Sequence, residues 1–199
     1  LYTAIHGDYP KAFAGDPPYD VMGVQQGDSK IIQAPLDWLG INYYNRHIIS
    51  NAPHVPYVQY SDVMPAVGPL TYNGWEVWPR GIYDIVTRIS KEYNRPIIEI
   101  TENGCAYSDG PLPEEPSKAP DPRRIEFYQG HLAELARAIK DGADVRGYHA
   151  WSLLDNYEWA EGYSQRFGLV YVDFRDQRRT IKDSGYWYGR VAAANHLNV

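Results

Sequence analysis

The sequence has little of three things that point to particular classes of protein: cysteine, clustered basic charge and long apolar runs. Cys105 is the only cysteine among 199 residues, so no intrachain disulfide can form, and a reducing, cytoplasmic location is expected. Lysine and arginine total 19 against 25 acidic residues, without a basic run, which argues against nucleic acid or a membrane surface as a partner. No apolar stretch is long enough to cross a bilayer. No group of cysteines and histidines has the spacing of a zinc site.

Aromatic residues are abundant instead. The chain holds six tryptophans and eighteen tyrosines, several of them beside Asn, Asp or Glu. Aromatic rings next to hydrogen-bonding groups suit sugars, which have apolar C–H faces and polar rims. A large aromatic core explains the same composition, and composition alone favours that explanation.

Apolar runs and helical periodicities alternate along the chain. Short apolar runs predict three buried strands, at 36–44, 96–101 and 145–151. Apolar residues at helical spacing predict helices after Pro79 and after Asp121-Pro122, with a last helix from about Asp183. An extended segment is predicted at 167–174, and the proline-rich and acidic stretch 106–122 predicts one long surface loop.

This alternation of strand and helix is the order of parallel βα units. A closed (β/α)8 barrel typically takes about 250 residues and eight such units, and its reactive groups lie at the carboxyl ends of the strands. Only three strands can be counted here, and three-eighths of a barrel would leave open strand edges. We therefore expect this chain to be a piece of a larger barrel.

The stretch ITENG, residues 100–104, places a carboxylate where the second apolar run ends. Asn103-Gly104 is a strong turn signal, so the strand is expected to end in a turn directly after Glu102. An isolated acidic residue at such a place is most often a solvated rim residue. At the carboxyl end of a barrel strand, however, it is also where a reactive group belongs.

Four longer strings resemble glycoside hydrolase family 1, the β-glucosidases. In chain order they are LGINYYNR, GWEVWPRGIYD, PIIEITENGCAYSDG and HAWSLLDNYEWAEGYSQRFGLVYVDF. The similarity runs from Gly7–Pro10 to the last helix, and several long motifs in the same order make it specific. Residues 11–33 depart from the common family pattern, which we expect to change only a surface loop. The resemblance implies that residues 1–199 are the C-terminal part of a single (β/α)8 barrel whose N-terminal strands are not in this chain.

By this resemblance Glu102 matches the catalytic nucleophile. Retaining glycosidases pair an ionised carboxylate with a protonated carboxyl about 5–5.5 Å away; the first forms a glycosyl ester, and the second protonates the leaving group and later activates water. Tyr44 is implied to hydrogen-bond Glu102, and Asn42 to face the same site. On an alternating strand, residues 42 and 44 point to one side and Tyr43 to the other. A hydroxyl donor beside a carboxylate favours its ionised form.

The last of the four strings is implied to hold the sugar. Trp151 matches a residue that stacks under the glycone, and Glu158 and Trp159 match residues that hydrogen-bond its hydroxyls. A carboxylate can accept hydrogen bonds from two neighbouring hydroxyls. A cis peptide bond is implied between Trp151 and Ser152. Trp75 matches a tryptophan at the aglycone entrance. The alternative interpretation of Trp75 is an aromatic residue of the core that caps a helix.

Three positions bear on the class of substrate. Relatives that act on 6-phosphorylated glycosides carry Ser, Lys and Tyr where this chain has Glu158, Gln165 and Phe167. A carboxylate repels a phosphate dianion, and no lysine stands there to neutralise it. The resemblance therefore implies unphosphorylated β-glucosides or cello-oligosaccharides as substrates, with Phe167 among the substrate-binding residues and without a metal or cofactor.

One part of the family's machinery is not in this sequence. The acid/base glutamate of the family lies in a T-x-N-E-P motif that is absent here, and PEEP at Pro113–Pro116 falls in a loop after Glu102 and does not replace it. The chain alone is therefore expected to be inactive, with the N-terminal part of the same barrel as its partner. The alternative is a catalytically inactive sugar-binding relative that lacks the acid/base residue.

Overall fold

The structure is a computed structural model that describes residues 1–9, 23–56, 59–63 and 68–197. The chain divides into two compact units, Leu1–Leu39 and Gly40–Val199. The expectation of a single barrel part over 1–199 stays a prediction.

The first unit contains two short helices, α1 (Tyr2–His6) and α2 (Asp28–Ile32). The side-chain amide of Gln33 donates to a carbonyl oxygen of α1 at 3.0 Å. Residues 11–33 were expected to alter only a surface loop. Of these, 11–22 lie outside the described residues, and the remainder includes α2, so the loop interpretation is wrong for that helical part.

A three-stranded sheet has the order β1 (Leu39–Asn42), β4 (Ile98–Asn103) and β5 (Val145–Ala150). β4 and β5 pair in parallel, so their carboxyl ends meet at one edge, where Asn103 lies opposite Ala150. The isoleucines of the central strand are fully buried, as a strand between two neighbours and a helical layer requires. The three predicted strands are confirmed, and the first is shorter than its apolar run.

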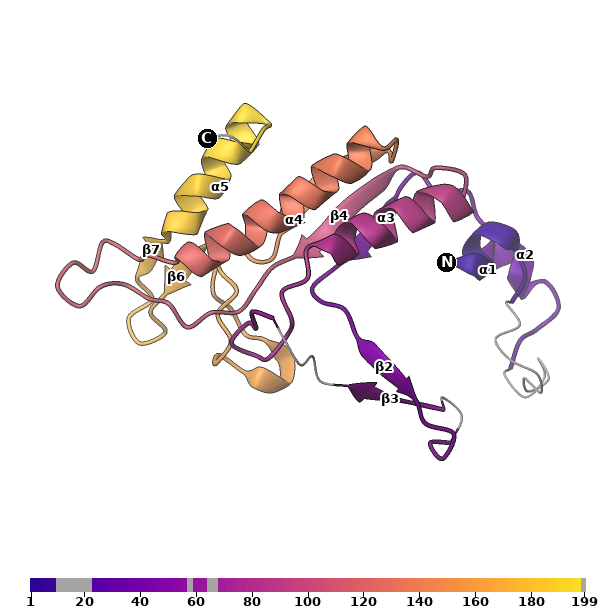
Figure 1. Cartoon of the computed structure of the whole chain (residues 1–199), viewed down its shortest axis with the longest axis horizontal. Helices are drawn as coiled ribbons and strands as arrows, with labels where there is room; N and C mark the ends of the chain where they lie inside the picture. The colour runs from indigo at the N-terminus through magenta and orange to yellow at the C-terminus, as the bar shows by residue number, and fades with distance from the viewer. Residues whose placement is uncertain (10–22, 57–58, 64–67, 198–199) are drawn as a thin grey trace. The chain divides into compact units, whose positions relative to one another are not determined.

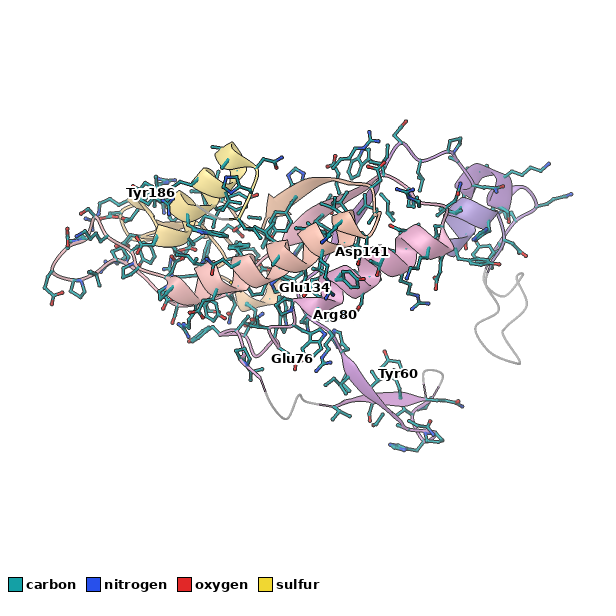
Figure 2. All side chains as sticks on the ribbon, turned by 45° about the horizontal axis from the view of Figure 1, so that its top comes forward. Tyr60, Glu76, Arg80, Glu134, Asp141 and Tyr186 are labelled. Carbon is teal, nitrogen blue, oxygen red and sulfur yellow. The ribbon has the colours of Figure 1, made fainter. Side chains whose placement is uncertain are left out.

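Three helices accompany this sheet: α3 (Arg80–Glu92), α4 (Pro122–Lys140) and α5 (Asp183–Ala194). α4 contacts both other helices, and Figure 1 shows it running beside α3. Figure 2 shows Arg80 of α3 close to Glu134 of α4. The helices confirm the periodicities, because their buried residues repeat at helical spacing, as Ile82, Val86 and Ile89 do in α3.

The start of α4 lies where the sequence predicts it, but its N-cap residue is bonded differently than expected. Asp121 is the N-cap residue and Pro122 the first helical residue, as predicted, but the Asp121 side chain makes no capping hydrogen bond. Its carboxylate accepts hydrogen bonds from the Ser184 backbone and hydroxyl at 2.8 and 2.5 Å instead. It thereby joins the beginnings of α4 and α5.

Four strands and a short helix complete the part of the chain that the structure describes. β2 (Ile48–Asn51) and β3 (Tyr60–Val63) form an antiparallel pair that was not predicted. β6 (Val170–Val172) confirms the predicted extended segment and pairs with β7 (Arg179–Ile181), and a 3-10 helix, η1, spans Trp159–Glu161.

The stretch from Ala106 to Pro122 connects β4 to α4 and is only partly a surface loop. Its middle is exposed, but Ala106, Tyr107 and Ala119 are buried. The connection is therefore anchored at both ends.

The apolar core lies between α4, α5 and the segments that follow β4 and precede β6. It contains a mixed set of residues: Cys105, Tyr107, Phe127, Tyr128, Leu169, Trp187 and Val191. An aromatic core therefore accounts for part of the aromatic content. Other rings are exposed: Tyr157 and Tyr163 contact each other with ring centroids 5.5 Å apart, whereas Trp159 makes no ring contact within the described residues. Within those same residues, no helix is both long and apolar enough to cross a membrane.

A fully buried histidine, His131, gives the fold a pH dependence. Its ring stacks on Phe127 with centroids 4.0 Å apart, and its Nδ1 lies 2.8 Å from the Phe127 carbonyl oxygen. Burial lowers the pKa of His131 to about 4. Between about pH 6.5 and 4 the unfolded chain binds a proton at this residue and the folded chain does not, so stability falls as the pH falls.

We predict that this residue removes about 3 kcal/mol of unfolding free energy between pH 7 and pH 4. In urea unfolding, His131→Phe should make the difference in stability between those two pH values smaller by that amount. His54, which is exposed, is the control, and His54→Gln should leave the difference unchanged. An unchanged difference in His131→Phe would show that burial does not hold this imidazole neutral.

Candidate active site

Glu102 lies near the carboxyl end of β4, half-buried, with Tyr44 against its carboxylate. The Tyr44 hydroxyl donates to Oε2 of Glu102 at 2.6 Å, so the predicted hydrogen bond is present. Burial, and next this hydrogen bond, raise the pKa of Tyr44 above its usual range. The negative charge of Glu158 raises it further, which places the Glu158 carboxylate in the same neighbourhood. The hydroxyl therefore stays protonated and can only donate to the carboxylate.

The two residues before Tyr44 point in opposite directions, as predicted for a strand. Tyr43 is buried, and its hydroxyl donates to the Trp78 carbonyl oxygen at 2.6 Å. Asn42 is exposed, and its Oδ1 accepts a hydrogen bond from the Thr101 hydroxyl at 2.6 Å. Asn42 is thus bonded to the residue before Glu102, and within the described residues it makes no hydrogen bond to the Glu102 carboxylate.

Asn103 does not form the turn that the Asn-Gly pair predicts. It is the last residue of β4 and fully buried, and both ends of its side-chain amide are used. Nδ2 donates to the Tyr43 carbonyl oxygen at 2.7 Å, and Oδ1 accepts from the Tyr148 hydroxyl at 2.6 Å. Sequence reasoning missed this role because the same dipeptide is typical of hairpin turns.

Position 104 requires glycine because the Trp151 carbonyl oxygen lies very close to it, and not because its backbone is left-handed. Its φ is not positive, and a Cβ atom built on it would lie 1.8 Å from the Trp151 carbonyl oxygen. Only a residue without a side chain lets the segment after β4 pass so near the end of β5. The turn interpretation of this pair is therefore wrong for both of its residues.

An aromatic wall stands behind the Tyr44 ring. Its ring centroid lies 5.3 Å from that of Trp75 and 6.1 Å from that of Phe167, and the latter two are 6.0 Å apart. Phe167 is only 2% exposed, so it supports Tyr44 and does not offer a face to a ligand. Its place among the substrate-binding residues is corrected accordingly. Trp75 is half-buried against this wall and caps no helix.

The loop that carries Trp75 is held by an ion pair between Glu76 and Arg46. Glu76, labelled in Figure 2, is 4% exposed and accepts from the Arg46 guanidinium at 2.6 and 3.1 Å. The same guanidinium lies 3.5 Å above the Trp78 ring. Because Arg46 is two residues from Tyr44, this two-point contact fixes Trp75 relative to Tyr44. Neither member of the pair was singled out from the sequence.

The predicted sugar-binding residues after β5 take different positions. Trp151 is half-buried, its peptide bond to Ser152 is cis as expected, and its carbonyl oxygen accepts from the Tyr128 hydroxyl at 3.2 Å. Glu158 is half-exposed directly before η1, where its backbone N–H donates to the Gly162 carbonyl oxygen at 2.7 Å. Trp159 is 81% exposed and contributes no ring contact within the described part of the chain. All three lie on the segment after β5.

Two sets of buried charges hold the backbone around these side chains. Arg124 is fully buried, and its Nε donates to the Asp121 carboxylate at 2.9 Å. Its terminal nitrogens donate to four backbone carbonyls, those of Cys105, Tyr107, Arg166 and Phe167. One guanidinium thereby ties the segment after Glu102 to the segment that carries Phe167.

The second set is centred on the buried carboxylate of Asp155. It accepts from Lys182 at 3.0 Å, from Arg166 at 2.7 Å and from the Gly168 backbone at 2.9 Å. Burial, and next the charge of Arg124, lower the pKa of Lys182 to about 8. Removing one partner of such a set leaves an uncompensated buried charge, so the loop after β5 is held rigidly.

The described residues contain no group of three or more His, Cys, Asp or Glu side chains placed to hold a metal ion. What the arrangement offers chemically is a carboxylate at a strand end with a fixed hydroxyl donor. Aromatic faces lie beside the Tyr44 donor, and the charge of a second acidic residue, Glu158, acts on the same hydroxyl. Such a site can hold a polar ligand with apolar faces next to a nucleophilic oxygen.

Comparison with known proteins gives a consistent picture. The family model described as glycosyl hydrolase family 1 matches residues 2–197. Beta-glucosidase A of Thermotoga maritima is 42% identical over 197 residues, which are 99% of this chain and 43% of that protein. The 1,4-beta-D-glucan glucohydrolase of Thermotoga neapolitana is 45% identical over 172 residues, 86% of this chain and 38% of that protein.

A solved structure, a family 1 β-glucosidase from Thermotoga maritima, superposes with a TM-score of 0.90 at 40% identity, covering all of this chain and 44% of that one. The chain thus spans less than half the length of these relatives and corresponds to their C-terminal part. The predicted fold class, the C-terminal portion of a (β/α)8 barrel, is confirmed.

The close approach at Gly104 predicts a large effect of a single methyl group. Gly104→Ala should lower the free energy of unfolding by about 3 kcal/mol or more, because the Trp151 carbonyl cannot move aside without disturbing β5. Gly189 is the matched control: it lies in α5 with nothing within 4 Å of an added Cβ. Gly189→Ala should raise stability by about 0.5–1 kcal/mol. Equal effects of the two substitutions in urea unfolding would contradict the close approach.

Proposed function

Because the chain belongs to glycosyl hydrolase family 1, we propose that it carries the nucleophile of a retaining β-glucosidase. The observation that carries the proposal is the contact between Glu102 and Tyr44. The carboxylate stands near the carboxyl end of a barrel strand with a hydroxyl donor 2.6 Å from one oxygen, and aromatic rings line one side. The other carboxylate oxygen accepts no hydrogen bond within the described residues and is available for attack.

In the proposed reaction, Glu102 attacks the anomeric carbon and the bond to the aglycone oxygen breaks. A protonated carboxyl from the N-terminal part of the barrel gives its proton to the departing oxygen. The same group, now ionised, takes a proton from water, which attacks the anomeric carbon and releases the sugar from Glu102. Two displacements at one carbon retain its configuration. Tyr44 would hold the carboxylate in line before the first step.

The sugar would be held by the segment after β5. Trp151 would stack against the apolar face of the glycone, and Glu158 and Trp159 would hydrogen-bond its hydroxyls. Trp159 is mostly exposed, and its indole N–H makes no hydrogen bond within the described residues, which leaves it open to such a bond. Trp75 would line the aglycone entrance, and Phe167 would act only by supporting Tyr44.

The proposed substrates are unphosphorylated β-glucosides and cello-oligosaccharides. A 6-phosphate would meet the Glu158 carboxylate, and Gln165 nearby in sequence is neutral and buried. Arg166, the Lys or Arg nearest to Glu158 in the sequence, is already paired with Asp155 at 2.7 Å. No free positive charge on this segment would compensate a phosphate.

The first test uses the 199-residue chain by itself. It should turn over an aryl β-glucoside no faster than buffer does, because it supplies one of the two carboxyl groups that the reaction needs. The control is the assembled enzyme, defined as this chain joined in one polypeptide to the N-terminal part of Thermotoga maritima beta-glucosidase A. Turnover by the isolated chain would show that the acid/base group lies within residues 1–199.

The second test is chemical labelling of the assembled enzyme with a 2-fluoro-glucosyl fluoride. Fluorine at C2 slows hydrolysis of the glycosyl ester, and fluoride leaves without needing a proton, so the ester accumulates and peptide mass mapping should place it on Glu102. Glu102→Gln should not be labelled. Glu99→Gln, on the same strand, should be labelled as the unmodified enzyme is.

Turnover without labelling of Glu102 would overturn the nucleophile assignment. Sugar binding without either turnover or labelling would instead favour an inactive sugar-binding protein.

A further inference from the structure

Asn103 follows the proposed nucleophile, and these two residues together hold Tyr43, which comes directly after β1. The Tyr43 backbone N–H donates to the Glu102 carbonyl oxygen at 2.9 Å. The Tyr43 carbonyl oxygen accepts from Nδ2 of Asn103 at 2.7 Å. Both polar groups of one residue, Tyr43, are therefore held by two consecutive residues of β4.

These two hydrogen bonds, which join Glu102 and Asn103 to Tyr43, form a clamp. The clamp controls the position of Tyr44, the residue that orients the nucleophile. The Tyr43 carbonyl belongs to the peptide unit that continues into Tyr44, and that unit is planar and rigid. A hydrogen bond to its oxygen therefore fixes where the Tyr44 backbone starts. The Tyr44 hydroxyl in turn donates to Glu102 at 2.6 Å. The backbone and side chains of 43–44 and 102–103 thus form a closed set of hydrogen bonds around the carboxylate.

The other side of Asn103 is bonded toward β5. Its Oδ1 accepts from the Tyr148 hydroxyl at 2.6 Å, and its backbone oxygen accepts from the Trp151 N–H at 2.9 Å. Trp151 is the residue proposed to stack on the glycone. Asn103 therefore connects the attacking group, the donor that orients it and the sugar platform.

From this geometry we infer that Asn103 is a positioning residue that sets the line of attack of Glu102 on the anomeric carbon. The inference rests on the proposed function. A carboxamide suits the role because it offers a donor and an acceptor on one short side chain. Asp at this position would turn a carboxylate oxygen toward the Tyr43 carbonyl, and Leu would leave a buried carbonyl and a buried hydroxyl without partners.

The expected effect falls on the chemical step and not on sugar binding. A displacement of a reacting group by about 1 Å can cost about 100-fold in rate, whereas ground-state contacts with the sugar come from other residues. In the assembled enzyme, Asn103→Asp should lower kcat for an aryl β-glucoside about 100-fold. KM and the inhibition constant of glucose should change by less than about threefold.

A milder variant tests the role of Asn103 through the other end of its side-chain amide. Tyr148→Phe keeps the ring and removes only the hydroxyl that donates to Oδ1 of Asn103. One lost hydrogen bond corresponds to about a fivefold effect, so kcat should fall about fivefold with KM unchanged. This variant decides the question if Asn103→Asp does not fold.

Ser184→Ala is the matched control for loss of stability. Ser184 is fully buried and hydrogen-bonded to Asp121, and within the described residues it makes no hydrogen bond to Tyr43, Asn103 or Tyr148. It should lower the melting temperature and leave kcat of the folded enzyme unchanged. A loss of kcat in this control equal to that in Tyr148→Phe would reduce the effect of the clamp to general destabilisation and overturn the inference.

Unchanged kcat in Tyr148→Phe, or a rise in KM equal to the fall in kcat/KM, would also overturn it. Failure of the proposed function is distinguished by the unmodified assembled enzyme. If the fluoro-sugar labels Glu102 there, the nucleophile assignment stands whatever the variants show, and only the role of Asn103 is rejected.

Discussion

The buried side-chain amide of Asn103 is the interaction on which the rest of the site depends. It is bonded through the Tyr43 carbonyl to the segment directly after β1 and through the Tyr148 hydroxyl to β5, while its own backbone ends the strand that carries Glu102. A buried amide that lost either bond would leave polar groups unsatisfied in an apolar setting, which costs about 1–3 kcal/mol for each group. The three strand ends are therefore fixed relative to one another by side-chain chemistry, beyond the hydrogen bonds of the sheet itself.

The loops beyond those strand ends are held by buried charges. Arg124 joins the segment after Glu102 to the segment that carries Phe167. Asp155, in the loop after β5, accepts hydrogen bonds from Lys182 and Arg166. Such sets add less to net stability than their contacts imply, because burying charge is costly, but breaking one is strongly destabilising. Their effect here is geometric. The aromatic wall behind Tyr44 and the proposed sugar-binding segment are both held on a rigid frame.

Local patterns in the sequence predicted the parts of the fold that follow local rules. Apolar runs located the three sheet strands, and helical spacing located α3, α4 and α5. The β2–β3 hairpin was missed because its residues are mostly exposed and show no alternation. The role of Asn103 was missed for a different reason: its partners lie 60 and 45 residues away in the sequence, so the local Asn-Gly pattern predicted a turn. The motif resemblance located Glu102 and Tyr44, whereas the burial of Phe167 depends on packing that no motif describes.

A double-mutant cycle on kcat of the assembled enzyme tests the central claim most directly, that Asn103 acts on Glu102 through Tyr44. Tyr44→Phe removes the hydroxyl that orients the carboxylate, and Asn103→Asp removes the clamp that places Tyr44. If the two act in one chain of contacts, the double variant loses much less activity than the product of the two single losses, with a coupling of about 1 kcal/mol or more. Losses that multiply would show that Asn103 and Tyr44 act independently and would contradict the account.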